Sequence, residues 1–286
     1  MLATSHRLSL ATGIGYHVLE WVGPPDGDLT FVLVHGFSDL AAAWTTVADQ
    51  LAQHAHVIAP DLRGHGDSDW ISGGGYYHFM DYVADLADVI RKLAKKRVIL
   101  VGHSMGGSVS GYYAGTRPDR LHALALVEGL GPPDQSTIDP AARAATWIDA
   151  WAKTRRKRVK TLASLEEAAS RLRKNDNLLG EEQSLMLARE GTVAIDDGFA
   201  WKHDPLHNSM GPYPYRVDNA AQFWRRIKCP VLAIDGSIMQ LNLSPEERAR
   251  RRAMFANCRH AVVEGAGHAV ARHQPRALAE LLLSLI

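Results

Sequence analysis

Cysteine is scarce in this sequence of 286 residues: Cys229 and Cys258 are the two present, and their spacing matches no metal-binding pattern. This scarcity argues against a disulfide framework and favours a reducing compartment. Long apolar runs are also missing, because no run approaches the ~20 residues that span a bilayer. The first 21 residues contain no apolar stretch typical of a signal peptide. We therefore predict a cytoplasmic protein without membrane insertion.

A strong charge of either sign is absent as well. The 32 Lys and Arg residues nearly balance 31 Asp and Glu residues, so the formal net charge is +1. This balance gives no global attraction to nucleic acid, and we predict no nucleic-acid partner. Two local basic clusters, residues 153–160 and the arginines of 248–252, are expected to be solvated helical faces.

The most informative stretch that is present ends in Gly-x-Ser-x-Gly. Four apolar residues at 98–101 precede Gly102, Ser104 and Gly106, and small residues follow. A strand that turns abruptly into a helix at a serine exposes the hydroxyl above the sheet edge, and the flanking glycines make room for the turn. Ser104 is therefore predicted to be a nucleophile, with the Met105 amide as one donor to an oxyanion.

Short apolar runs alternate with helical patterns along most of the chain. Strands are expected within 6–22 and at 30–34, 56–59, 98–101, 121–127, 231–234 and 261–263. This alternation predicts an α/β fold with a mostly parallel, doubly wound sheet, whose sites lie at the carboxyl ends of the strands. Between Gly131 and Arg226 the signals are mainly helical. We predict a core of residues 1–131 and 226–286 with a helical cap inserted at 132–225.

Four segments taken together resemble the α/β-hydrolase superfamily: residues 35–37, 61–68, 102–107 and 265–268. The short segments 199–205 and 214–216 resemble the cap of serine-hydrolase-like members. This resemblance implies that His268 is the base that activates Ser104. It also implies that the Phe37 amide is the second oxyanion donor, and that the protein needs neither a metal nor an organic cofactor.

The carboxylate that should orient His268 is not at the position where the family usually has it. That position follows the strand at 231–234, and Met239 stands there. Glu128 directly follows the strand at 121–127, where some branches, including the haloalkane dehalogenases, keep the acid. We predict Glu128 as the acid, and Asp235, which ends the neighbouring strand, remains the alternative.

These residues predict a serine hydrolase that cleaves a carboxylic ester of a small, apolar acyl compound through an acyl-enzyme. Hydrolysis of a carbon–carbon bond, lactonase, thioesterase or perhydrolase activity on the same residues remains open. A non-catalytic ligand receptor is the alternative from another class, favoured by Met239 alone. Aromatic and apolar side chains predicted to line the substrate pocket are Trp147, Trp151, Trp201, Tyr213 and Met239.

Overall fold

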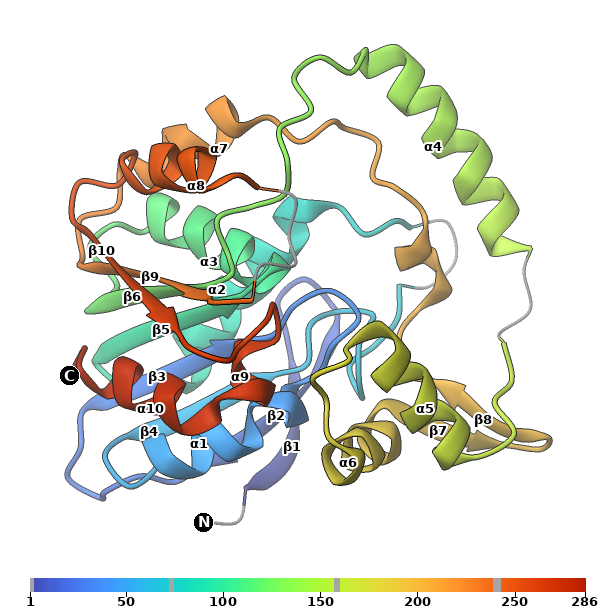
Figure 1. Ribbon diagram of the computed structural model, residues 1–286, viewed down its shortest axis with the longest axis horizontal. Coiled ribbons are helices and arrows are strands. Elements are labelled where there is room, and N and C mark those ends of the chain that lie inside the picture. Colours follow the sequence, from blue (N-terminus) through green and yellow to red (C-terminus); the bar gives the residue numbers. More distant parts are fainter. Residues whose placement is uncertain (1–2, 72–74, 157–159, 239–242) are drawn as a thin grey trace.

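The computed structural model describes residues 3–71, 75–156, 160–238 and 243–286 (Figure 1). An eight-stranded sheet forms its centre, in the order β1-β2-β4-β3-β5-β6-β9-β10. β2 pairs antiparallel with both β1 and β4, and the other neighbouring strands of this sheet pair in parallel. The predicted doubly wound, mostly parallel sheet is therefore confirmed. The bounds are β1 Thr4–Ser9, β2 Gly15–Trp21, β3 Leu29–Val34, β4 His56–Pro60, β5 Arg97–His103, β6 Ala123–Val127, β9 Val231–Gly236 and β10 Cys258–Val263.

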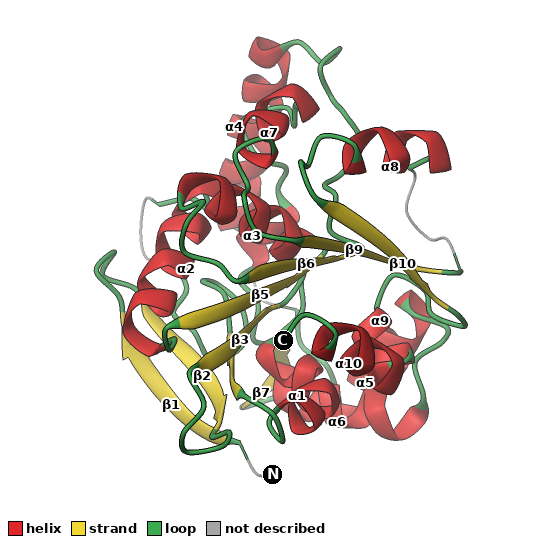
Figure 2. Ribbon diagram, turned by 90° about the vertical axis from the view of Figure 1, so that its left-hand side faces the viewer, coloured by secondary structure: helices red, strands yellow, loops and turns green. Residues whose placement is uncertain are grey.

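Helices cover both faces of this sheet (Figure 2). One face carries α1 (Thr45–Leu51), α9 (Val270–His273) and α10 (Pro275–Leu283). The other face carries α2 (Phe79–Leu93), α3 (Met105–Thr116), α7 (Val217–Trp224) and α8 (Pro245–Arg252). Parallel strands need such crossover helices, and the helices shield the strands from water on both sides.

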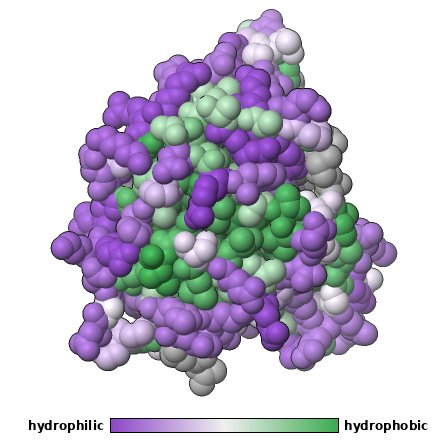
Figure 3. Space-filling view, turned by 60° about the vertical axis from the view of Figure 1, so that its left-hand side comes forward, coloured by the Kyte–Doolittle hydropathy of each residue, from purple (hydrophilic) through white to green (hydrophobic). Residues whose placement is uncertain are grey.

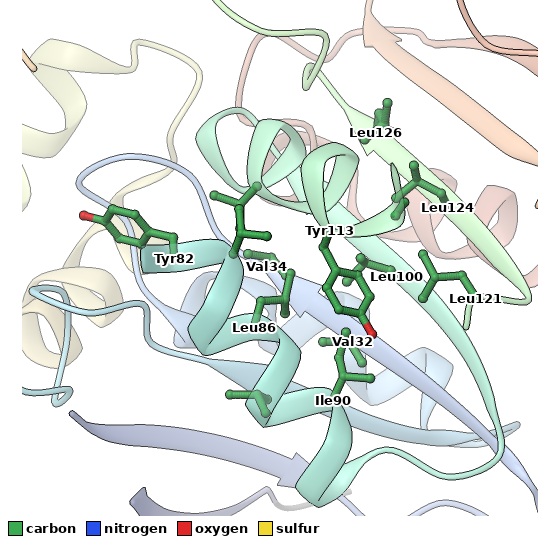
Figure 4. Packing of buried hydrophobic residues seen from close by; sticks show 14 of the residues in the cluster. Val32, Val34, Tyr82, Leu86, Ile90, Leu100, Tyr113, Leu121, Leu124 and Leu126 are labelled. Atoms are coloured by element: carbon green, nitrogen blue, oxygen red, sulfur yellow. The ribbon is translucent and has the colours of Figure 1, made fainter. Parts of the chain in front are cut away.

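The alternation of side chains along each central strand produces two apolar cores. In β3, Val32 and Val34 pack with α2 and α3, whereas Phe31 and Leu33 pack with α1 and α10. Figure 4 shows the first core, where Leu86 and Ile90 of α2 and Tyr113 of α3 lie above the strands. All seven of these side chains are buried, so the sheet is a rigid base for the loops at its carboxyl edge.

The predicted cap range contains α4 (Pro140–Arg155), α5 (Leu165–Asn175), α6 (Glu181–Gly191) and a hairpin of β7 (Thr192–Ile195) and β8 (Gly198–Trp201). Asp139 and Ser164 accept hydrogen bonds from the first turns of α4 and α5, as expected of N-caps. In Figure 1, α4 stands apart from the unit formed by α5, α6 and the hairpin. At the end of this range, α7 packs on α3 of the core.

The outer surface is mixed. On the face displayed in Figure 3, apolar side chains gather near the middle and polar side chains surround them. Among the residues that the structure describes, no helix has the length and apolar character needed to cross a membrane.

Candidate active site

Ser104 occupies a strained turn between β5 and α3. Its backbone has φ 53° and ψ −117°, a conformation that residues other than glycine rarely adopt. A Cβ atom on Gly102 would lie 2.4 Å from the carbonyl oxygen of Gly106, and a Cβ on Gly106 would lie 2.4 Å from that of Val34. Both glycines are therefore required sterically, as the sequence predicted.

His268 lies beside this serine. Its Nε2 is 3.0 Å from Ser104 Oγ. His103 lies against it, with ring centroids 4.8 Å apart, and His103 Nε2 donates to the carbonyl oxygen of His268 across 2.8 Å. Burial and the neighbouring His268 lower the pKa of His103 to about 4, so His103 is neutral near pH 7. His103 thus holds the loop after β10 in place without adding charge.

Glu128 follows β6 and faces the other side of the same imidazole. Its Oε2 lies 3.7 Å from His268 Nδ1, and its Oε1 accepts a 2.9 Å hydrogen bond from the Gly236 amide. Burial opposes ionisation of Glu128, but His268, the Gly236 amide and Arg248 together outweigh it and lower the pKa of the carboxyl group. The side chain is therefore a buried carboxylate near neutral pH.

Asp235, the alternative acid, is directed toward α8. Its Oδ1 accepts from Arg248 Nη1 across 2.8 Å, and its Oδ2 contacts His260 Nε2 at 2.9 Å and Arg252 Nη1 at 3.3 Å. Glu128 is thus the carboxylate that the structure brings to His268, while Asp235 is occupied by three basic side chains.

The prediction of a solvated arginine face on α8 is wrong for two of its members. Arg248 is 5% exposed and Arg251 is fully buried. Both Nη atoms of Arg248 lie 3.2 Å from Glu128 Oε2, so this guanidinium joins Glu128 to Asp235. Arg251 Nη1 donates to three consecutive main-chain carbonyls, those of residues 130–132. The i, i+3 spacing of the two arginines places them on one helix face, which was the available sequence signal.

The loop after β3 is held by a neutral histidine. The Leu62 amide donates to His35 Nε2 across 2.9 Å, so the ring proton resides on Nδ1, which donates to the Gly36 carbonyl oxygen at 2.7 Å. His35 therefore links the loop after β3 to the loop after β4. Within the described residues, the Phe37 amide donates to no protein acceptor.

The main chain around Ser104 offers a second donor. The Ser104 amide donates to the Val127 carbonyl oxygen, 3.0 Å away, and is therefore engaged within the protein. The Met105 amide opens α3, and the first amide of a helix has no acceptor within that helix. The amides of Phe37 and Met105 are therefore the candidate donors to an oxyanion.

A cavity of about 630 Å³ adjoins Ser104. Phe37, Met105 and Tyr213 line both this cavity and a neighbouring one of about 360 Å³. Most of the larger cavity's wall is apolar or aromatic, which suits an organic ligand. Its other lining residues include Phe79, Met80, Ser108, Tyr112, Glu128, Pro132, Pro133, Pro214, Tyr215, Arg216, Asn219 and Leu243.

Three of the aromatic side chains predicted for the pocket lie elsewhere. Trp147 packs on Tyr76 and stacks on Trp151 at centroid distances of 5.2 and 5.8 Å, because both tryptophans project from one face of α4. Trp201 packs in the small core formed by the α5–α6 unit. Tyr213 does line the cavity, and Met239 lies outside the described residues.

The described residues contain one cluster with the composition of a metal site, formed by His17, Asp61 and Asp67. Asp61 Oδ2 already accepts from the Asp67 amide at 3.0 Å and contacts His17 Nδ1 at 2.7 Å. Asp67 is paired with Lys202 Nζ at 2.8 Å. These carboxylates are satisfied by protein donors, and the cluster supports the loop after β4.

Comparison with known sequences identifies similar proteins along nearly the whole chain. The model of the alpha/beta hydrolase family matches residues 31–281. A serine hydrolase-like protein of Danio rerio is 26% identical over 274 residues, which cover 92% of this chain and 83% of that protein. A putative 2-succinyl-6-hydroxy-2,4-cyclohexadiene-1-carboxylate synthase of Bacillus subtilis (strain 168) is 32% identical over 120 residues, 42% of this chain and 43% of that protein.

Solved structures agree in fold. The thioesterase domain from the curacin biosynthetic pathway has a TM-score of 0.86 and 27% identity, covering 99% of this chain and 100% of that domain. A hypothetical protein from Pseudomonas aeruginosa PAO1 has a TM-score of 0.84, also with 27% identity, covering 100% and 98% of the two chains.

Proposed function

The chain belongs to the alpha/beta hydrolase family, and we propose that it is a serine hydrolase that cleaves carboxylic esters through Ser104, His268 and Glu128. The observation that carries this proposal is the 3.0 Å contact between Ser104 Oγ and His268 Nε2, with Glu128 facing the opposite ring nitrogen at 3.7 Å. A serine hydroxyl is a poor nucleophile alone, and a base in hydrogen-bond contact activates it.

In the proposed reaction, His268 takes the Ser104 proton while Oγ attacks the ester carbonyl carbon. The Glu128 carboxylate stabilises the imidazolium, and the amides of Phe37 and Met105 stabilise the oxyanion. The imidazolium then protonates the departing alcohol, which leaves an acyl group on Ser104. Water, deprotonated by His268, attacks this acyl-enzyme; the bond to Ser104 Oγ then breaks, the imidazolium returns the proton to Oγ, and the acid is released.

The two adjoining cavities support a substrate with a group on each side of the reacting carbonyl. Phe37 and Met105, the proposed oxyanion donors, line both cavities, so the carbonyl would lie at their junction. We further propose that the inserted range 132–225 acts as a cap, because Pro133 and Tyr213 within it form part of the cavity wall.

A thioester is the second candidate substrate, because the 27% identical curacin-pathway domain is a thioesterase. Acyl transfer from sulfur uses the same serine, base and oxyanion donors. Conversely, the strained backbone of Ser104 supports catalysis over a non-catalytic ligand receptor, since such strain persists where the surrounding structure enforces it for function.

The test compares the wild-type protein with Ser104→Ala and Ser108→Ala on oxygen esters, thioesters, lactones, vinylogous diketones and a perhydrolysis assay. Ser108 lines the same cavity but lies one helical turn beyond the nucleophile turn, so it is the matched control. We expect ester hydrolysis that falls by about 10³-fold or more in Ser104→Ala and by less than about tenfold in Ser108→Ala. Undiminished hydrolysis by Ser104→Ala would contradict the proposal, and the substrate class with the highest kcat/KM decides between the candidates.

A further inference from the structure

One cationic side chain, Arg216, is found among the described residues that line the larger cavity. It lies directly before α7 and is partly buried. Its neighbours on the wall are mainly apolar or aromatic, and Phe79, Tyr112 and Leu243 are examples. A guanidinium on such a wall has lost part of its hydration and gains from any anion that enters the cavity.

The part of the chain that the structure describes offers this guanidinium no hydrogen bond, carboxylate partner or aromatic ring. The arginines of α8 on the same face of the sheet differ in this respect. Arg248 is bound to two carboxylates, and Arg251 is bound to Glu247 and to main-chain carbonyls. Arg216 thus has its guanidinium available for a ligand, whereas Arg248 and Arg251 are each paired with carboxylates of the protein.

The backbone on both sides of Arg216 is nevertheless held firmly. The Gln135 amide donates to the Tyr215 carbonyl oxygen at 2.8 Å, and the Tyr215 amide donates to Gln135 Oε1 at 3.1 Å. The Val217 amide donates to Asp134 Oδ1 at 2.8 Å. Three hydrogen bonds therefore fix the position from which Arg216 extends, and none of them uses its guanidinium.

We propose that Arg216 binds an oxyanion group, a carboxylate or a sulfonate, on the part of the substrate that fills the larger cavity. Arg216 offers the planar set of N–H donors that suits two oxygens of one anionic group. Asn219 lies three residues along α7 and lines the same cavity, so its amide is a neutral second donor. The inference rests on the proposed function, because it names the substrate class of the Ser104 site: an ester whose acyl chain ends in an anion.

The test uses acyl chains of equal length with and without the charge. The probes are the 4-nitrophenyl monoesters of adipic and suberic acid, the corresponding hexanoate and octanoate, and a sulfonate-terminated hexanoate. The diacids are long enough to avoid rapid cyclisation to an anhydride. The variants are Arg216→Gln and the control Arg225→Gln, an exposed arginine at the other end of α7 that does not line the cavity.

We expect Arg216→Gln to lower kcat/KM for the anionic esters by about 10- to 100-fold, because a hydrogen bond to a charged group is lost. The neutral esters should change little, and Arg225→Gln should resemble the wild-type protein on both. A larger effect on the sulfonate than on the carboxylate would assign the group as a sulfonate, and the reverse would assign a carboxylate.

An equal change for charged and neutral esters in Arg216→Gln, or no change in either, would overturn this inference. Continued hydrolysis of the neutral esters by the wild-type protein would show that the proposed function survives such a failure. If no ester in the set is hydrolysed and Ser104 resists acylation, the proposed function fails and the inference with it.

Discussion

Replacing Glu128 by glutamine removes the negative charge beside His268 while keeping the shape of the side chain. A glutamine carbonyl oxygen can still accept from the Gly236 amide, which donates to Glu128 Oε1 in the wild-type protein. At an effective dielectric constant of about 20, unit charges 3.7 Å apart attract each other by about 4 kcal/mol. Loss of that attraction for the imidazolium corresponds to about 10³-fold in rate.

The matched control for this change is Asp235→Asn. Asp235 is also a buried carboxylate bound to Arg248, but its oxygens contact α8 and His260. We expect Asp235→Asn to lower kcat by less than about tenfold, against about 10³-fold for Glu128→Gln. The assay is steady-state ester hydrolysis at fixed pH, with circular dichroism and thermal unfolding to verify that both variants fold. Near-normal turnover by Glu128→Gln, or an equal loss in Asp235→Asn, would refute the assignment of Glu128.

Three further predictions concern stability and are measured by denaturant unfolding. Arg248→Met leaves Glu128 buried without its cation, which raises the pKa of Glu128 in the folded state. The loss of stability should be largest near pH 7 and shrink as Glu128 becomes protonated in acid, whereas a loss independent of pH would exclude this cause. Gly106→Ala places a Cβ 2.4 Å from a carbonyl oxygen at the end of β3 and should lower the free energy of unfolding by about 1–3 kcal/mol. An unchanged denaturation midpoint would show that the turn can relax. In the wild-type protein, Arg63 Nε and Nη2 donate to the fully buried Asp85 at 2.6 and 2.8 Å. Arg63→Met removes this salt bridge and should lower the free energy of unfolding by about 3–5 kcal/mol. A loss below about 1 kcal/mol would contradict the importance of this pair.

Local sequence signals sufficed for the sheet and for the turn at Ser104. Continuous apolar runs mark strands that are buried on both faces, and glycines mark a turn in which any side chain would collide. The order of the parallel strands then brings the loops at their carboxyl ends together. The resemblance to the α/β-hydrolase superfamily implied that His268 is the base for Ser104, and the structure places His268 Nε2 3.0 Å from Ser104 Oγ.

The predictions that failed concern side chains whose surroundings come from distant parts of the chain. Arg248 belongs to a helix with many charged residues, and its burial becomes evident only when α8 lies over the ends of β6 and β9. The environments of Trp147 and Trp201 depend on how the inserted segments dock, and a helical pattern does not encode that docking. The sequence therefore predicted a pocket position for aromatic side chains that pack elsewhere.

The most direct test of the central claim is covalent labelling by a fluorophosphonate, followed by mass measurement of the intact protein and of its peptides. An activated serine displaces fluoride and retains the phosphonyl group. We predict one adduct, located on Ser104, which is absent in Ser104→Ala and forms at least about 10²-fold more slowly in His268→Asn. An unlabelled wild-type protein, or the same adduct in Ser104→Ala, would contradict the claim that Ser104 is a nucleophile activated by His268.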